Sequence, residues 1–249
     1  MIMSSTLRHH LGAGSALLAT AALAIAGMPS PAVAGAPTGV VIDYDGFDDA
    51  AGLALNGATV VNGSLRLTGR APHSAASAWS TTMVATDGSF TTTFELSLGR
   101  HGGFGDGVAF VLQNVGTDVL GWGGGGLGYR TIAPSVAIEF DTYQNAYETD
   151  GNHVALVIDG DVEAATTTKQ IPFSLYKGAV QSTVSYDAAT TKLRVWVKRV
   201  GQLGKGTLAV EQRIDLTEAL GSDSAYAGFT GATGSNFALQ DVTSWILNA

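Results

Sequence analysis

Alternation of apolar and polar residues runs through most of the chain after residue 40 and predicts β-strands. Residues 89–98 alternate Phe and Leu with Thr, Glu and Ser, so a strand there has one apolar and one polar face. Two similar runs at 181–186 and 192–198 flank the turn sequence DAATT and predict a hairpin. Residues 107–113 form a continuous apolar run, which suits a strand buried on both faces.

Shorter apolar runs add further strands, and the chain shows almost no helical pattern. These strands are predicted at 40–43, 58–67, 226–229 and 242–247. The pair Asn62-Gly63 marks a hairpin turn within the second of them. A single helical turn is predicted at 216–221, with Asp215 or Thr217 as its N-cap. The pattern therefore favours an all-β fold of antiparallel strands, arranged as a sandwich or jelly roll.

Candidate metal ligands gather in one stretch, from residue 135 to residue 159. The strand predicted at 135–141 alternates with period two, so Glu139 and Asp141 share one face. An apolar run at 154–158 begins another strand, so the residues between them form a loop that can fold over the two carboxylates. The side chains in this stretch that could hold a metal are Glu139, Asp141, Asn145, Asp150 and His153.

This mixture of side chains suits divalent cations. Clustered carboxylates repel one another unless a cation neutralises them. Oxygen ligands alone suit calcium, whereas an imidazole beside carboxylates suits a transition metal such as manganese, so the stretch could hold both ions side by side. The alternative interpretation is a solvated acidic strand end with an ordinary surface histidine.

The sequence VAIEFDTYQN at 136–145 resembles the metal-binding signature of the legume-type (L-type) lectins, a family of two-metal carbohydrate-binding proteins. Three other regions resemble family motifs in the expected order, namely GDGVAF at 105–110, GGGGLGY at 123–129, and AGFTGATGSN at 227–236 followed by QDVTSW at 240–245. The resemblance implies a concanavalin-like jelly-roll sandwich of antiparallel sheets, and a carbohydrate-binding protein that is not an enzyme.

The resemblance also implies two metal sites. Manganese would be held by Glu139, Asp141, Asp150 and His153. Calcium would be held by Asp141, the Tyr143 carbonyl, Asn145 and Asp150. One feature departs from the family pattern, because only Gly151 and Asn152 separate Asp150 from His153. Glu148 stands at the more usual distance before His153.

A sugar pocket is implied as well, built from Asp106, Gly125, Tyr143, Asn145, Ser235 and Asn236. By the resemblance, Asp106 follows a cis peptide bond from Gly105 and accepts hydrogen bonds from two sugar hydroxyls. Gly125 donates its backbone N–H, and Tyr143 stacks its ring on a pyranose. Asn145 both ligates calcium and donates to the sugar. The alternatives are an Asx turn at Asp106, a flexible glycine loop and a half-buried strand tyrosine.

The first residues of the chain have the pattern of an export signal. Arg8 precedes an uncharged apolar run at 11–28, and Ala32-Val33-Ala34 forms an A-x-A cleavage site. We therefore expect a signal peptide at 1–34 and an L-type lectin domain at 35–249, which together describe a secreted bacterial member of the family. The apolar run is too short for a good membrane anchor, so membrane insertion is not expected.

Charge and composition narrow the range of partners. The formal net charge is −8, and Lys and Arg are outnumbered 13 to 21 by Asp and Glu, so a basic face for nucleic acid is not expected. The chain has no cysteine, which excludes thiol chemistry and disulfides. The expected partners are glycans or glycoconjugates, and the fold could form a homo-oligomer through sheet edges or faces.

Two other functions compete with sugar binding. Jelly-roll glycoside hydrolases need a pair of carboxylates across the scissile bond. Laminarinase-like enzymes carry these at E-x-D-x-x-E on one strand. Here Glu139 and Asp141 are followed by Gln144, so the second glutamate of that motif is missing. The other alternative is a structural or adhesive surface domain that keeps the fold but has lost sugar binding.

Overall fold

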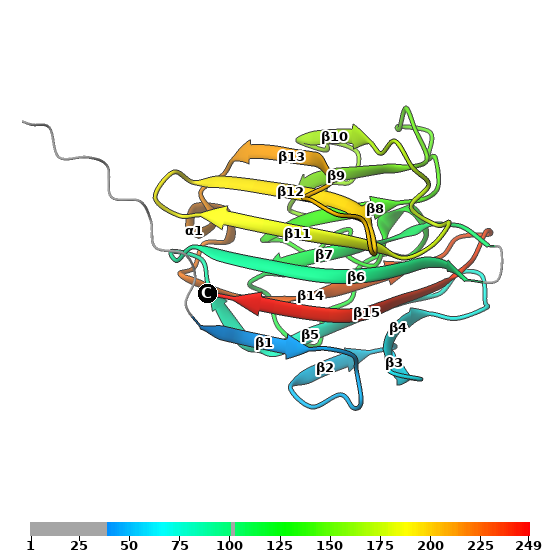
Figure 1. Ribbon diagram of the computed structural model, residues 1–249, viewed down its shortest axis with the longest axis horizontal. Helices are drawn as coiled ribbons and strands as arrows, with labels where there is room; N and C mark the ends of the chain where they lie inside the picture. Colours follow the sequence, from blue (N-terminus) through cyan, green and yellow to red (C-terminus); the bar gives the residue numbers. More distant parts are fainter. Residues whose placement is uncertain (1–38, 101–102) are drawn as a thin grey trace, which may run out of the picture. The chain divides into compact units, whose positions relative to one another are not determined.

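The computed structural model describes residues 39–100 and 103–249, and the predicted signal peptide and its cleavage site lie outside these residues. The described chain folds into two antiparallel sheets, with the larger sheet in front of the smaller one in Figure 1. This confirms the predicted all-β sandwich.

The larger sheet has the strand order β13 (Thr207–Arg213), β12 (Lys192–Arg199), β11 (Val180–Asp187), β6 (Phe90–Arg100), β15 (Leu239–Asn248), β4 (Ser64–Thr68) and β3 (Thr59–Val61). Strand β1 (Val40–Tyr44) also pairs with β15. The smaller sheet has the order β10 (Thr167–Gln170), β9 (His153–Ile158), β8 (Ser135–Asp141), β7 (Gly107–Gln113), β14 (Ser224–Ala232), β5 (Ala75–Ala85) and β2 (Leu53–Asn56). The described helices are α1 (Leu216–Leu220) and the 3₁₀ turn η1 (Gly124–Gly126).

Aromatic side chains from both sheets meet in the core. Phe94 and Trp245 belong to the larger sheet, whereas Phe110 and Phe229 belong to the smaller one. The ring centroid of Phe229 lies 5.0 Å from those of both Phe94 and Trp245, in edge-on geometry. The indole N–H of Trp245 donates to the hydroxyl of Thr92 over 3.0 Å, so its buried polar group is satisfied. The core therefore fixes how one sheet packs on the other.

The register of the smaller sheet brings distant segments to one end. Gly107, which starts β7, pairs with Asp141 at the end of β8 and with Ala232 at the end of β14. Asp141 in turn pairs with His153, the first residue of β9. Because antiparallel neighbours run in opposite directions, the loops before β7 and β9 and those after β8 and β14 emerge together. These loops contain most of the predicted site residues.

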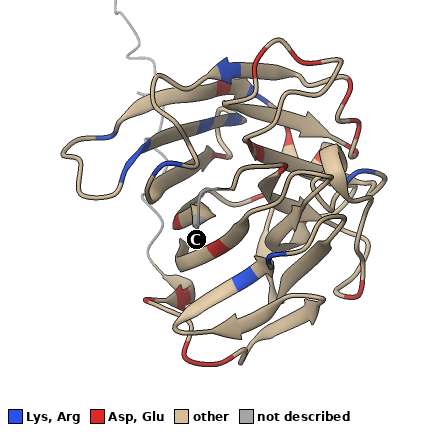
Figure 2. Cartoon of the chain, turned by 90° about the vertical axis from the view of Figure 1, so that its right-hand side faces the viewer, with Lys and Arg blue, Asp and Glu red and all other residues tan. Residues whose placement is uncertain are grey.

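Two further observations concern possible partners. In Figure 2 Lys and Arg lie mostly on the strands in the upper half of the view, and β12 alone carries Lys192, Arg194, Lys198 and Arg199. Within the same residues, the longest α-helix has five residues, and no helix has the length and apolarity needed to cross a membrane.

Candidate functional site

Asp106 is held in place by its backbone. The Gly105–Asp106 peptide bond is cis, as the family resemblance implied. The Asp106 N–H donates to the carbonyl of Ala232 over 3.0 Å, and its carbonyl accepts from the N–H of Thr142 over 2.8 Å. The Thr142 hydroxyl accepts from the Gly105 N–H and donates to the Asp106 carbonyl, both over 2.9 Å. Strand β8 and strand β14 therefore clamp Asp106 from both sides.

The Asp106 carboxylate lies between two glycine-containing loops. The N–H of Gly234 donates to Oδ1 over 3.2 Å, and a Cβ placed on Gly234 or on Gly124 would lie 3.1 or 3.3 Å from Oδ2. The residue is 4% exposed. Burial raises the pKa of the Asp106 carboxyl, and the charge of Glu148 raises it further, while the Gly234 N–H and His73 act to lower it. The Asp106 carboxylate is thus a hydrogen-bond acceptor that few water molecules can reach.

The other predicted sugar-binding residues surround this carboxylate. A Cβ on Gly125 would come within 2.5–2.8 Å of the Asn145 side-chain amide, so these two residues are in direct contact. A Cβ on Gly105 would lie 3.7 Å from the Cβ of Tyr143 and 3.3 Å from that of Asn236. Ser235 and Asn236 are exposed on the loop after Gly234. The structure therefore brings these predicted residues to one place, and their roles toward a sugar stay predictions.

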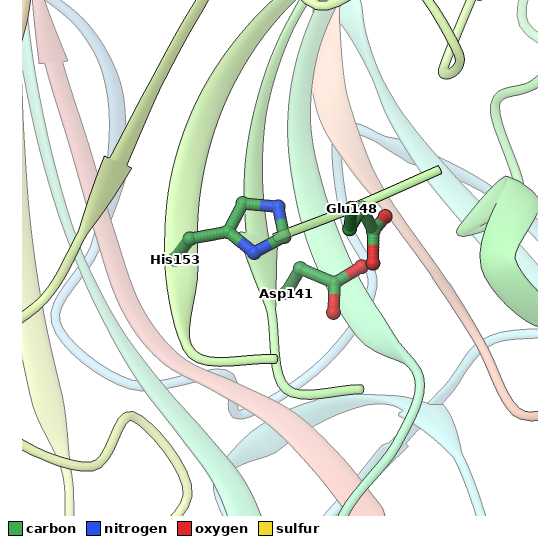
Figure 3. A group of neighbouring side chains, drawn as sticks. All are labelled: Asp141, Glu148 and His153. Atoms are coloured by element: carbon green, nitrogen blue, oxygen red, sulfur yellow. The ribbon is translucent and has the colours of Figure 1, made fainter. Parts of the chain in front are cut away.

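A group of three side chains near these residues has the composition of a metal site. Asp141, Glu148 and His153 offer ligand atoms that all lie within 4.8 Å of one another. Figure 3 shows the carboxylates of Asp141 and Glu148 facing each other, with the imidazole of His153 beside Asp141. The Nδ1 atom of His153 lies 2.7 Å from the Asp150 carbonyl. Because a carbonyl only accepts, Nδ1 carries the proton and the lone pair of Nε2 stays free for a cation.

The electrostatics of the cluster fit a cation. Burial raises the pKa of Glu139 to about 8, with a further increase from Glu148 and a decrease from the hydrogen bond that the Tyr129 hydroxyl donates. Burial also raises the pKa of Asp141 well above its ordinary value, and Glu148 adds to that effect. Among the described residues, no Lys or Arg forms an ion pair with these acids. A divalent cation would replace the missing positive charge.

The side chains of Asp150 and Asn145 already make hydrogen bonds to other residues of the site. The Asp150 carboxylate accepts from the Asn152 N–H and from the Gln170 amide, each over 2.7 Å. The Asn145 N–H donates to Glu148 over 2.6 Å, and its side-chain amide donates to the same carboxylate. The metal-ligand assignments of Glu139, Asp141, Tyr143, Asn145, Asp150 and His153 therefore stay predictions, of which Asp141 and His153 lie in the three-residue cluster.

Four residues of the site were not among the predicted ones. Glu148 could have been found from its spacing before His153, which is the more usual one for the family. Gly124 and Gly234 were flagged only as parts of glycine-containing loops. Thr142 gave no signal, because its role depends on the strand register that sets it beside Asp106.

Comparison with known proteins decides the family. Residues 43–244 match the family described as "Legume lectin beta-barrel domain", and this range includes every predicted site residue. The chain belongs to the legume lectin family. The resemblance drawn from the sequence motifs is thereby confirmed at the level of the family.

Two curated relatives of this legume lectin domain show how far the similarity extends. The "Basic agglutinin" of Psophocarpus tetragonolobus is 33% identical over 155 residues, which cover 58% of this chain and 61% of the agglutinin. The "L-type lectin-domain containing receptor kinase S.7" of Oryza sativa subsp. japonica is 31% identical over 189 residues, covering 70% of this chain and 26% of the kinase. The chain thus spans about three fifths of the agglutinin and a quarter of the kinase.

Solved structures give the same result for the fold. Basic winged bean lectin with Tn-antigen has a TM-score of 0.68 at 25% identity, covering 83% of this chain and 96% of that one. Lectin II from Ulex europaeus has a TM-score of 0.71 at 22% identity, with 83% and 97% covered, and it supports the fold alone. The agglutinin and the basic winged bean lectin are lectins by name, which agrees with the expectation from the sequence that this domain is not an enzyme.

Proposed function

We propose that this legume lectin domain binds carbohydrate reversibly around Asp106, and that its ligands are glycans or glycoconjugates outside the cell that makes it. The observation that carries the proposal is the convergence on one buried carboxylate. Asp106 is enclosed by Gly124 and Gly234, and Asn145 lies against Gly125 at the same sheet end. A charged acceptor beside an amide and glycine backbone suits the dense hydroxyls of a sugar ring.

Calcium and a transition metal such as manganese are part of the proposal. Asp141, Glu148 and His153 would hold the transition metal, with Glu139 behind them, whereas Asn145 and the Tyr143 carbonyl would serve calcium. Bound cations would neutralise the cluster and fix the loop from which Tyr143 and Asn145 reach the sugar. Glu148 takes the place first assigned to Asp150, because its carboxylate is the one that faces Asp141 and His153.

A glycan array with purified protein tests the proposal. We expect saturable binding to a defined set of glycans in calcium and manganese, and loss of that binding in EDTA. Absence of binding to any glycan in the presence of both cations would contradict the proposed function. Binding that persists unchanged in EDTA would contradict the role of the metals while leaving sugar binding intact.

Secretion is proposed from the first 34 residues, and the bacterial origin stays a prediction. Expression of the full chain in a bacterial host should deliver the protein to the exported fraction with Gly35 as its first residue. Terminal sequencing of that product is the test, and recovery of the uncleaved chain inside the cell would contradict it.

A further inference from the structure

The hairpin of strands β12 and β13, residues 192–213, carries a positive charge that the rest of the chain does not share. Six of the chain's 13 Lys and Arg residues lie in this hairpin, against one of its 21 Asp and Glu residues. The hairpin therefore has a formal charge of +5, whereas all other residues together have a formal charge of −13. Strand β13 is the outermost strand on this side of the larger sheet (Figure 1). An acidic protein thus presents one basic edge.

The turn between the two strands, residues 200–206, is apolar at its most exposed point. The side chain of Leu203 is 94% exposed, and Val200 and Leu208 on either side of it are exposed as well. Leu208 pairs with Trp196, which stands on the less buried face of β12. Apolar side chains therefore extend from the turn onto the outer face of the sheet. Neighbouring exposed apolar residues of this kind mark a surface that contacts another molecule or a membrane.

Cations lie beside this apolar turn. The Nζ atom of Lys205 lies 4.8 Å from the ring centroid of Trp196, and the Nζ atom of Lys198 donates to the carbonyl of Gly204 over 3.1 Å. Among the described residues, neither lysine forms an ion pair with an acid. Both lysines line a cavity of about 340 Å³, together with three hydroxyl-bearing residues of neighbouring strands, Thr91, Thr183 and Ser185. Amines beside hydroxyl groups suit the oxygens of a phosphate.

An aliphatic turn beside cations fits an anionic lipid membrane better than it fits other anionic partners. Burial of a leucine side chain in the acyl region is favourable, and lysine side chains bury their methylene stems while their amines stay at the headgroups. Tryptophan is enriched at the same depth. A nucleic acid or another soluble polyanion offers charge but no apolar phase for Leu203. Because salt screens charges more than about 8 Å apart, a membrane at the hairpin interacts mainly with its basic residues.

We propose that the turn of the β12–β13 hairpin attaches this lectin domain to membranes that contain anionic phospholipids. Leu203 enters the membrane interface, and Lys198 and Lys205 contact lipid phosphates at the cavity beside Trp196. The attachment lies at the membrane surface and needs no segment that crosses the bilayer. It does not depend on the proposed binding of sugar at Asp106, because no residue of the hairpin belongs to that site.

Co-sedimentation with vesicles that carry no sugar tests the proposal. The protein should bind vesicles of phosphatidylcholine and phosphatidylglycerol, and its affinity for vesicles of phosphatidylcholine alone should be at least about twentyfold lower. One Lys or Arg near an anionic surface contributes about fivefold in affinity, so Lys198→Gln/Lys205→Gln should lose about 25-fold. Leu203→Ser should lose about tenfold, because its apolar contact with the lipid is removed.

Two variants provide matched controls at other surfaces. Arg70→Gln removes one charge from an exposed residue after β4, across the larger sheet from the hairpin, and is compared with Lys205→Gln alone. Val115→Ser removes an exposed aliphatic side chain from the loop after β7 and is compared with Leu203→Ser. Both controls should bind anionic vesicles as the wild-type protein does. Circular dichroism establishes that each variant is folded.

Absence of binding to anionic vesicles would overturn the proposal, and so would unchanged affinity of the folded Lys198→Gln/Lys205→Gln variant. Polyphosphate, a soluble polyanion, separates a lipid phosphate from phosphate in solution. If Leu203→Ser binds vesicles as tightly as the wild-type protein, while the double lysine variant loses affinity for vesicles and polyphosphate alike, the hairpin is a general anion-binding surface and the membrane is not its partner. Glycan binding on the array is measured separately, so the proposed function stands or falls independently of these results.

Discussion

We expect the side chain of Asp106 to contribute a large share of the free energy of glycan binding. Asp106→Ala should abolish detectable glycan binding, because sugar hydroxyls would lose a charged acceptor, at a cost of about 2–4 kcal/mol of affinity. The backbone hydrogen bonds that hold this residue do not involve its side chain, so the fold should persist. Calorimetry and circular dichroism measure the two effects. Wild-type affinity in the folded variant would remove Asp106 from the site.

Gly234 lies so close to the Asp106 carboxylate that a methyl group at this position would displace it. In Gly234→Ala the new Cβ would lie 3.1 Å from Asp106 Oδ2, so the carboxylate must shift and glycan affinity should fall about tenfold or more. Gly69→Ala is the control, because no atom lies within 4 Å of a Cβ at that position. Equal affinities of the two variants for the same glycan would show that the carboxylate position is not critical.

Glu148 and Asp150 can be told apart by metal titration. Glu148→Gln should weaken binding of manganese by about 10- to 100-fold, because its carboxylate faces Asp141 and His153. Asp150→Asn should have a smaller effect, since that carboxylate is already engaged by Asn152 and Gln170. Calorimetric titration of metal-free protein gives both affinities. A larger loss in Asp150→Asn would restore Asp150 as the ligand.

At the scale of elements, strand β8 places the carboxyl groups of Glu139 and Asp141 where water cannot reach them. Folding without metal keeps the pKa of Glu139 near 8, above its value in the unfolded chain, and raises that of Asp141 as well. The unfolded chain therefore releases these protons at a lower pH than the folded chain, so rising pH favours unfolding. In the presence of chelator, the melting temperature should therefore decrease as the pH is raised from 5 to 8.

Addition of calcium and manganese should reverse this pH trend, because cations bind the ionised carboxylates and stabilise the folded state. Thermal melts at the two pH values, with and without cations, provide the comparison. A melting temperature in chelator that rises or stays constant toward pH 8 would contradict the prediction.

The strands that could be predicted from the sequence are those with a clear pattern. The hairpin of β11 and β12 has one buried and one wetter face, and its alternation is complete. Strand β5 was not predicted, because residues 76–80 are buried in succession and show no period, and all of them except Trp79 have small side chains. Strands β2, β10 and β13 were also not predicted. Two of them are short edge strands, and β13 has an irregular burial pattern at the edge of its sheet.

The residues of the candidate site can also be divided into those that the sequence alone indicates and those that depend on how the strands pair. Asp106, Asp141 and His153 stand in motifs whose spacing is local, so the sequence alone could single them out. The contact of Gly234 with Asp106 joins residues 128 positions apart and follows only from the pairing of β7 with β14. The position of Glu148 depends on how the loop after β8 folds back, which spacing suggests but does not determine.

The whole molecule should bind sugars without cutting them. Glu139, Asp141 and Glu148 would be held ionised by cations, which makes them poor general acids, and Asp106 would be occupied by sugar hydroxyls. Oligosaccharides incubated with the protein, calcium and manganese should be recovered intact by chromatography. Saturable, metal-dependent release of shorter sugars that disappears in Glu148→Gln would show a hydrolase.

Strand β14 lies between β5 and β7, although more than a hundred residues separate it from either neighbour along the chain. During synthesis the ribosome must therefore release the chain as far as β14 before the middle of the smaller sheet can close. Until then β5 and β7 have unpaired edges, and Asp106 lacks the Ala232 carbonyl that anchors it. Glycan capture would thus report that β14 has been made and paired, and a nascent fragment ending before residue 224 should depend on chaperones to protect its open sheet edges.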